Sequence, residues 1–344
     1  MIKAHPNGHG YGRANELTGI YFMKTLLSVA AILAALITAG CEKETATRET
    51  SGGARHVIAV IPKLTNTVYW RSVLAGAKEA GRDFGYEILW DGPDRETNSA
   101  RQIAIVEDAI NRRVEGVVIA PVDRTALVPS VEQLDQLNTP CVIIDSGLDT
   151  VRFLSFASTD NYQGGVLAAR RMGAVLGGKG NVVVVRHIAG SHATIKRVSG
   201  FTDTLAKEFP GIQIVASESG QDTAETAKTA TAEMLRLHPD VQGLFACTVD
   251  VSVGALQALE AAKRTDVKMV AFDPAKSLLD GLRSGEVSAI IVQDPFKMGY
   301  EGVKVVALRN KGQTSPRLID TGVEMVTSEN LTDPKIMRLL GEQQ

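Results

Sequence analysis

The sequence predicts an α/β protein built from two doubly wound parallel-sheet lobes. From residue 56 onward, short β-branched runs alternate with helical patterns almost without interruption, which is typical of parallel strands joined by crossover helices. The alternation occurs twice along about 290 residues, which is more than one hydrophobic core comfortably supports. Each series therefore supplies its own sheet, and we expect a cleft between the two lobes.

Each series consists of apolar runs that predict strands, with helical periodicity between them. In the first series, strands are expected at 56–61, 86–90, 116–120 and 141–145, and helices at 68–84, 98–113 and 125–137. The second series repeats the pattern. Its strands are expected at 181–186, 212–217, 243–247, 268–272 and 288–293, and its helices at 196–209, 224–237, 252–263 and 275–283.

An export signal and a tether precede the folded part. Lys24 is followed by 16 apolar or small residues and then by Cys41, a pattern that resembles a bacterial lipoprotein signal and is shorter than the about 20 residues of a membrane-spanning helix. We expect translation to start at Met23, residues 1–40 to be removed, and Cys41 to carry a lipid. The polar residues 41–55 would then be a flexible tether with a reach of roughly 20 Å. Plain secretion and a retained helix are the alternatives.

The composition excludes several classes of function. A net charge of -2 provides no basic field for nucleic acid or an anionic surface. The three cysteines lie far apart, and Cys141 and Cys247 fall in predicted strands, where we expect them to be buried and free. No motif for a metal, a phosphate or a cofactor is present, so we expect none of these to bind. The four histidines after residue 55 are interpreted as surface or hydrogen-bonded residues, not ligands.

The residues that follow each predicted strand form the candidate site, because open parallel sheets bind ligands at the carboxyl ends of their strands. These positions carry carboxylates, amides, hydroxyls and cations, together with two aromatic residues. This mixture suits a polyol, since hydroxyls both donate and accept hydrogen bonds and aromatic faces pack against the C–H faces of a ring. The candidates are Lys63, Asn66, Tyr69, Trp70, Asp145, Arg197, Thr248, Asp273 and Gln293.

Several spaced motifs accompany this order of elements. They are Asn66, Tyr69-Trp70, Asp145, Asn161-Tyr-Gln-Gly-Gly165, Arg197 with Gly200-Phe201, His238-Pro-Asp240, Ala271-Phe-Asp273 and Gln293. Together with the order of elements, these motifs resemble the periplasmic sugar-binding proteins of the ribose-binding type. The resemblance implies a type I periplasmic binding protein, in which three hinge crossings join the lobes. The crossings are expected near Thr159, Gln293 and Asp320, which puts 56–159 with 294–320 in the N-terminal lobe and 160–293 with 321–344 in the C-terminal lobe.

The same resemblance implies the function and the role of each residue. The protein would be a monomeric periplasmic lipoprotein that captures a monosaccharide or related small polyol and delivers it to an ABC transporter permease. Asn66, Asp145, Asp273 and Gln293 stand where the family bonds sugar hydroxyls, and Tyr69 and Trp70 where two aromatics contact the ring. Ser146 and Thr248 replace an arginine and an asparagine of the ribose-binding pattern, and Arg197 stands without its usual neighbouring arginine. Lys63 supplies the missing positive charge, and residues 61–63 also resemble the autoinducer-2-binding branch.

Other interpretations stay open at this point. Asp145 and Asp273 could cap turns or helices, Tyr69 and Trp70 could be core residues, and Arg197 could be a structural residue that binds a strand end. A sensor of a sugar or an autoinducer-2-like signal would use the same cleft. An enzyme is disfavoured, because a glycosidase needs two carboxylates at a defined separation and no such environment is indicated. A transcription repressor of the same fold is disfavoured, because it would need an N-terminal helix-turn-helix and this sequence has the export signal there.

Overall fold

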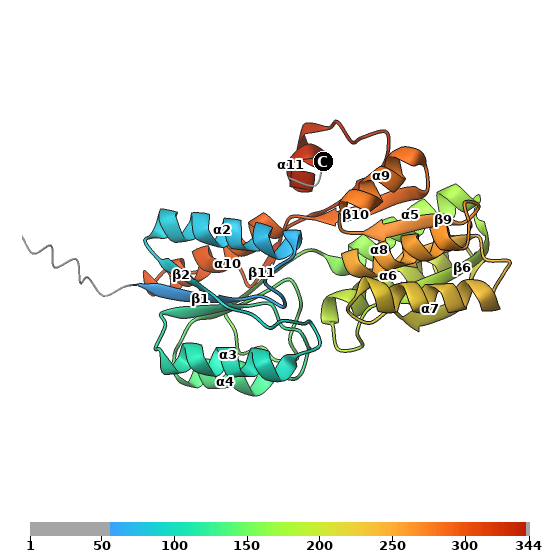
Figure 1. Ribbon diagram of the computed structural model, residues 1–344. Helices are drawn as coiled ribbons and strands as arrows, with labels where there is room; N and C mark the ends of the chain where they lie inside the picture. Colours follow the sequence, from blue (N-terminus) through green and yellow to red (C-terminus); the bar gives the residue numbers. More distant parts are fainter. Residues whose placement is uncertain (1–55, 342–344) are drawn as a thin grey trace, which may run out of the picture. The chain divides into compact units, whose positions relative to one another are not determined.

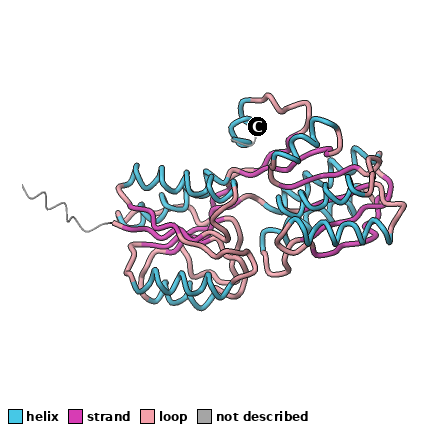
Figure 2. The backbone as a smooth tube through the Cα atoms, viewed as in Figure 1, coloured by secondary structure: helices cyan, strands magenta, loops and turns pink. Residues whose placement is uncertain are grey.

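A computed structural model describes residues 56–341 of the 344-residue chain (Figure 1). The predicted signal, Cys41 and the tether lie outside the described residues. Within residues 56–341, two six-stranded sheets each lie between layers of helices, as Figure 2 shows. The α/β class with two lobes is thereby confirmed.

The first sheet is parallel throughout. Its strands lie side by side in the order β11-β5-β4-β3-β1-β2, so the chain winds outward in both directions from β1. Such an order creates a crevice between the ends of β1 and β3, where ligands bind in doubly wound folds. The bounds are β1 Val57–Ile61, β2 Glu87–Trp90, β3 Gly116–Ile119, β4 Cys141–Ile144, β5 Ser155–Ser158 and β11 Leu318–Asp320.

The second sheet repeats this arrangement. Its order is β12-β10-β9-β8-β6-β7, with β6 in the place that β1 takes in the first sheet and β9 in the place of β4. Only the edge strand β12 runs antiparallel to its neighbour in this sheet. The bounds are β6 Lys179–Arg186, β7 Gly211–Ser219, β8 Gly243–Ala246, β9 Lys268–Phe272, β10 Val287–Gln293 and β12 Val323–Val326.

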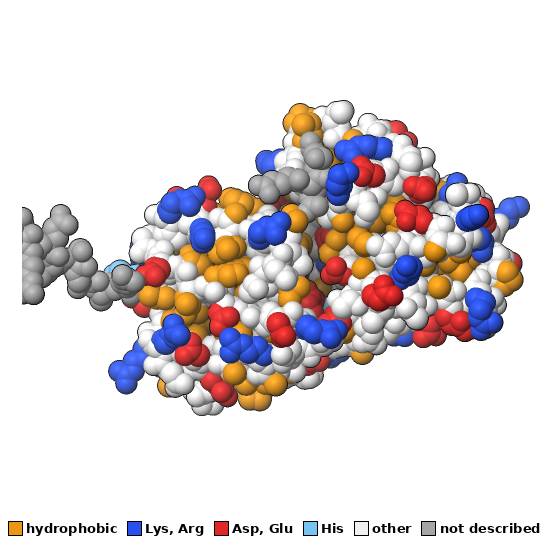
Figure 3. Space-filling view, in the orientation of Figure 1, with side chains coloured by type: hydrophobic (Ala, Val, Ile, Leu, Met, Phe, Trp, Pro, Cys, Tyr) orange, Lys and Arg blue, Asp and Glu red, His pale blue; other side chains and the backbone are white. Residues whose placement is uncertain are grey.

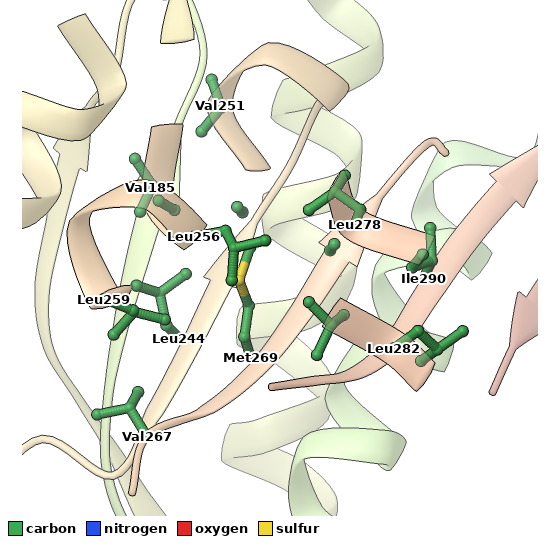
Figure 4. Packing of buried hydrophobic residues seen from close by; sticks show 14 of the residues in the cluster. Val185, Leu244, Val251, Leu256, Leu259, Val267, Met269, Leu278, Leu282 and Ile290 are labelled. Atoms are coloured by element: carbon green, nitrogen blue, oxygen red, sulfur yellow. The ribbon is translucent and has the colours of Figure 1, made fainter. Parts of the chain in front are cut away.

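Helices cover both faces of each sheet and enclose four apolar clusters. On the first sheet, α2 (Val68–Phe84) and α10 (Pro295–Asn310) cover one face, and α3 (Ser99–Asn111) and α4 (Val128–Gln136) the other. The second sheet has α5 and α6 on one face and α7, α8, α9 and α11 on the other, and Figure 4 shows the packing of the latter cluster. The bounds are α5 Asn161–Leu176, α6 His192–Glu208, α7 Ala224–Leu237, α8 Val249–Ala261, α9 Lys276–Ser284 and α11 Pro334–Leu340.

The chain passes between the two sheets three times. It leaves the first sheet after β5, whereupon α5 packs on the second sheet. It returns after β10, and α10 packs on the first sheet. Between β11 and β12 it passes to the second sheet again. The two sheets therefore exchange helices: each fifth strand in sequence order leads to a helix that covers the other sheet.

The exchanged helices approach their neighbours very closely, and glycine makes this approach possible. A Cβ atom at Gly165 of α5 would lie 2.0 Å from the carbonyl oxygen of Arg197 in α6. A Cβ atom at Gly299 of α10 would likewise lie 2.0 Å from the carbonyl oxygen of Val73 in α2. Both glycines lie inside helices, where glycine costs about 1 kcal/mol relative to alanine, so close packing overrides propensity here.

Several elements differ from the sequence-based expectations. Helix α6 starts at His192, four residues earlier than its apolar periodicity predicts. The segments that form β5, α5, α10, β11, β12 and α11 had been assigned no element; α5 and α10 are rich in glycine, which weakens the helical pattern. Cys141 and Cys247 are buried and free, as predicted. Among residues 56–341, no helix has both the length and the apolar character needed to span a bilayer.

Candidate functional site

A polar cavity lies at the carboxyl ends of the strands of both sheets. The space between its lining residues is about 510 Å³, including the part open to solvent. Eight of the nine residues predicted to bind a ligand line this cavity. They are Lys63, Tyr69, Trp70, Asp145, Arg197, Thr248, Asp273 and Gln293.

Asn66 is the predicted site residue that the structure does not bring to the cavity. Its side chain is exposed in the loop before α2, and its backbone carbonyl accepts a hydrogen bond of 3.2 Å from Arg71. Thr248 does line the cavity, but its hydroxyl also caps α8 by accepting a 3.4 Å hydrogen bond from the backbone of Val251.

Lys63 and Asp145 form a buried ion pair in the wall contributed by the first lobe. The Lys63 ammonium lies 2.7 Å from Asp145 Oδ2, and the two residues are 5% and 4% exposed. Tyr69 donates its hydroxyl to the other carboxylate oxygen at 2.8 Å. Burial alone would raise the pKa of Asp145, but Lys63 and the hydrogen bonds outweigh it, so the pKa lies below its ordinary value. Asp145 is therefore an anion with two donors already in place.

The loop that carries Lys63 is fixed by a buried glutamine. Gln102 of α3 donates its amide to the carbonyl oxygens of Pro62 and Ala120, at 3.0 and 2.8 Å, and accepts from the backbone of Val122 at 2.9 Å. These three hydrogen bonds tie the loop that carries Lys63 and the loop after β3 to one buried side chain.

Asp273 is the counterpart of Asp145 in the second lobe. Gln293 donates its amide to both carboxylate oxygens, at 2.9 and 3.0 Å, and Arg197 Nη1 lies 3.6 Å from Oδ2. Burial raises the pKa of Asp273 to about 6, although Arg197 and Gln293 act in the opposite direction and Asp145 adds to the rise. This carboxyl group is consequently poised to gain or lose its proton near neutral pH.

Arg197 serves both the cavity and the structure of the second lobe. Its Nε donates to Asn161 Oδ1 at 2.8 Å, and its Nη1 donates to the carbonyl oxygen of Cys247 at 2.9 Å. The guanidinium also stacks on Phe272, 3.7 Å from the ring centroid. These contacts hold the cation at the end of β8 while it faces Asp273, so the structural and binding interpretations are compatible.

Tyr69 and Trp70 both line the cavity although they are neighbours on α2. Their rings meet edge to face with centroids 4.9 Å apart. Trp70 also belongs to the core cluster under α2, and its indole donates to Glu96 at 3.3 Å. Trp70 is therefore both a core residue and part of the cavity wall.

Asp145 and Asp273 adopt the same unusual backbone conformation. Their φ angles are 60° and 63°, in the left-handed region that aspartate and asparagine tolerate better than most residues. They follow β4 and β9, which hold equivalent places in the two sheets. Neither side chain caps the helix that follows, since α9 begins after Ala275 without a side-chain cap. The turn directs both carboxylates toward the cavity instead.

Three further titratable residues line the cavity, and none of them is among the candidates selected from the sequence. Glu96 lies in the loop after β2, a strand end that had not been considered. His187, which had been interpreted as a surface or satisfied residue, follows β6, is buried, and has its Nε2 3.8 Å from Glu96 Oε2. Asp250 lies in the first turn of α8. The strand-end rule does reach His187, but this histidine was set aside because no second ligand-type residue accompanies it in the sequence. Applied also to β2, the rule points to the loop that carries Glu96.

Polar contacts join the two lobes at the margin of the cavity. Arg95 donates to both oxygens of Asp222, at 2.7 and 3.2 Å, and Thr97 donates to the same carboxylate at 3.1 Å. Deeper in, the hydroxyl of Ser146 accepts from the backbone of Ala193 at 3.1 Å. Figure 3 shows one face of the molecule, where acidic side chains border the groove between the lobes.

Known proteins match this arrangement over most of the chain. The family model of the periplasmic binding protein domain matches residues 58–314. The ribose import binding protein of Escherichia coli is 28% identical over 268 residues, which cover 78% of this chain and 89% of that protein.

Two solved structures extend the likeness to the whole fold. A carbohydrate transporter solute-binding protein of Agrobacterium radiobacter, in complex with D-arabinose, has a TM-score of 0.81 and 34% identity, and covers 84% of this chain and 100% of that one. An ABC transporter solute-binding protein of Agrobacterium vitis with bound D-fucose has a TM-score of 0.80 and 33% identity, with coverages of 83% and 100%. These relatives are binding proteins of transporters and not enzymes. With its family match, its two wound sheets and its polar cavity at their strand ends, the chain belongs to the periplasmic binding proteins, among the sugar-binding solute-binding proteins of ABC transporters.

Proposed function

We propose that this protein captures a monosaccharide or a related small polyol in the cavity between its lobes and delivers it to an ABC importer. One observation carries the proposal: two equivalent carboxyl groups, Asp145 and Asp273, converge on the cavity from the two lobes, each with a cation beside it. Hydroxyl groups can donate to the carboxyl oxygens and accept from Lys63 and Arg197, and Tyr69 and Trp70 offer aromatic surface to a ring.

Closure of the lobes is the proposed means of signalling occupancy to the importer. We assign residues 56–159 and 294–320 to one lobe and residues 160–293 and 321–344 to the other, with the three crossings as the hinge. A ligand that contacts Asp145 and Asp273 together stabilises the closed arrangement over the open one, by its difference in affinity for the two. The permease would then recognise the closed form. The protein acts as a monomer in this proposal, which light scattering behind a sizing column would check.

Membership of the family implies an extracytoplasmic location. We further propose that Cys41 is lipidated after removal of residues 1–40 and that residues 41–55 tether the binding lobes to the membrane. Mass spectrometry of the N-terminal peptide from membranes tests this. A diacylglyceryl mass on Cys41, absent from a Cys41→Ser variant that appears in the soluble fraction, is the expected result; an unmodified Cys41 would contradict it.

A thermal-shift screen of pentoses, hexoses, ketoses and polyols tests the binding function, because a ligand selective for the folded state raises the melting temperature. Titration calorimetry then compares wild type with Asp145→Asn and Asp273→Asn. Asparagine keeps the left-handed backbone and removes only the charge, so each change is expected to weaken binding of the identified sugar at least about tenfold. Asp135→Asn, at an exposed position of α4, is the control with unchanged affinity. Unchanged affinity in both cavity variants would refute the assignment of the site.

A sensor that passes the bound state to a membrane receptor is the second candidate. Lys63 favours it, because this cation lies in the cavity wall within a segment that resembles the autoinducer-2-binding branch. Adding autoinducer-2 to the same thermal-shift panel discriminates between the two. A melting shift with autoinducer-2 that exceeds the shift with every sugar would favour the sensor, and the reverse order supports transport.

A further inference from the structure

The charges that line the cavity do not balance. Two cations, Lys63 and Arg197, face four carboxyl groups, and each cation is already beside one of them: Lys63 at Asp145 and Arg197 at Asp273. Two carboxyl groups remain, those of Glu96 and Asp250. Among residues 56–341, no lysine or arginine lies within ion-pair distance of either one.

The two unbalanced carboxyl groups belong to opposite lobes. Glu96 comes from the loop after β2 in the first lobe, and Asp250 from the first turn of α8 in the second. Burial, together with repulsion from Glu96 and Asp222, raises the pKa of Asp250 to about 6. Asp222 is neutralised by Arg95 at the cavity margin. Within the described part of the chain, Glu96 has only an uncharged donor, the Trp70 indole at 3.3 Å, and Asp250 has no lysine or arginine partner. Closing the lobes thus brings like charges together at one end of the cavity.

A buried histidine with unused bonding capacity lies at the same end. His187 is 94% buried and lines the cavity, and its Nε2 lies 3.8 Å from Glu96 Oε2. Burial lowers the pKa of His187 and so disfavours the charged ring, although the nearby Glu96 acts in the opposite direction. Nδ1 of this ring is buried and has no hydrogen-bond partner among the described residues.

This end of the cavity therefore offers two carboxyl groups with no cation beside them among the described residues. A sugar hydroxyl has one proton to donate and no charge, whereas an ammonium group has three protons and a positive charge. We infer that the Glu96, Asp250 and His187 end of the cavity takes the ammonium group of an amino sugar, with the rest of the ring held by the Asp145 and Asp273 end. The inference rests on the proposed sugar-binding function and narrows its ligand class beyond the neutral sugars D-arabinose and D-fucose found in the structural neighbours.

Matched pairs of sugars test this assignment by titration calorimetry at pH 7.5. The probes are D-glucose with D-glucosamine, D-galactose with D-galactosamine and D-mannose with D-mannosamine, each with its N-acetyl derivative as the uncharged analogue. At least one amino sugar is expected to bind about tenfold or more tightly than its neutral parent and its N-acetyl derivative, since charge-assisted hydrogen bonds are roughly twice as strong as neutral ones. Raising the salt concentration leaves most of this preference intact, because the site is buried.

Isosteric variants locate the effect. Glu96→Gln and Asp250→Asn each remove one charge, and in each variant the affinity for the amino sugar is expected to fall to within about threefold of the affinity for the neutral parent, both measured on the same variant. Glu260→Gln removes a charge from the exposed face of the same helix α8 and should keep the full preference. Melting curves without ligand check that all three variants fold. If Asp250→Asn does not fold, Glu96→Gln alone provides the test, because Glu96 lies in a loop outside α8.

The outcomes separate this inference from the function beneath it. If neutral parents bind as tightly as the amino sugars or more tightly, the ammonium assignment is overturned while sugar binding stands. If both cavity variants keep the preference of the wild type, the ammonium group lies elsewhere and the assignment to this end is wrong. If no probe in this panel or in the wider sugar screen binds, the proposed function falls along with the inference.

Discussion

Replacement of Lys63 by methionine should expose how strongly the Asp145 carboxylate depends on its ion pair. The two charges lie 2.7 Å apart and almost out of contact with water, and at an effective dielectric constant of about 20 their attraction is about 6 kcal/mol. Apolar contacts of the methionine recover part of this, so we expect a net loss of about 3 to 5 kcal/mol in the free energy of unfolding at pH 7.5. That loss lowers the melting temperature by roughly 6 to 15 °C.

Urea unfolding at two pH values adds a check on the cause. In the wild type the pKa of Asp145 is lowered, so its stabilising contribution is present above the unfolded-state pKa and disappears as the pH falls through the folded-state value. Without Lys63, only Arg197 and Tyr69 oppose the effect of burial, so the pKa of Asp145 is expected to rise. The deficit of Lys63→Met relative to wild type should therefore shrink between pH 7.5 and pH 5, because the carboxyl group can take up a proton.

A second substitution and a surface control complete the test. Lys63→Met with Asp145→Asn removes both charges while the amide oxygen can still accept from Tyr69, so the double variant should regain at least about 2 kcal/mol. Lys276→Met breaks the exposed pair with Asp280 on α9 and should cost less than about 0.5 kcal/mol. A Lys63→Met protein as stable as the control, or a double variant no more stable than the single one, would refute the reasoning.

Three further changes test other parts of the structure. Burial raises the pKa of Asp250 to about 6, so the folded protein retains a proton that the unfolded chain releases near pH 4. The free energy of unfolding contributed by this group therefore falls as the pH rises from 4 to 6. Asp250→Asn should remove this fall, which amounts to up to about 3 kcal/mol in urea unfolding. An unaltered profile would show that Asp250 is not so perturbed. Asp222→Asn removes the anion that Arg95 and Thr97 bind across the lobes, which should favour the open form by up to about fivefold. The radius of gyration without ligand should then increase in small-angle scattering. Asp108→Asn, on the exposed side of α3, is the control and should leave this radius unchanged. Equal radii would argue against a role of this contact in closure. Gly165→Ala forces a methyl group against the Arg197 carbonyl, which should lower the free energy of unfolding by about 1 to 3 kcal/mol and weaken ligand binding. Ala174→Ser, on the exposed side of α5, is the control and should change neither. A Gly165→Ala protein that melts like wild type would mean that α5 and α6 separate easily.

The regular pattern of strands and helices could be predicted because most elements bury one clear apolar face. Helices α2 and α7 have the bounds that their periodicity predicts, and the strand runs fall within one to three residues of expectation. Helix α5 could not be found in this way. Its glycines lower helix propensity, and what stabilises it is the close approach to α6, a contact between segments that the local pattern does not reveal.

The candidate site followed from one topological rule, and its gaps have physical causes. Asp145 and Asp273 were found because they directly follow buried strands. Asn66 was expected from resemblance, but the chain turns at the start of α2 so that this side chain faces water while Tyr69 and Trp70 face the cavity. His187 has no sequence neighbour to mark it. Only the folding of the β2–α3 loop against β6 brings Glu96 to within 3.8 Å of it.

The exchange of α5 and α10 between the sheets has a consequence for how the chain can be divided. A fragment that stops at Thr159 contains most of the first sheet but lacks α10, so Val118, Val142 and Ile144 would lose part of the apolar cover on that face. A fragment that starts after Thr159 contains α10 but lacks the strands of the first sheet that α10 covers in the whole protein. Neither piece is self-sufficient, and the two lobes must acquire their cores in the same cooperative folding event. Separately produced pieces should therefore be insoluble alone, yet able to reassemble when they are refolded together.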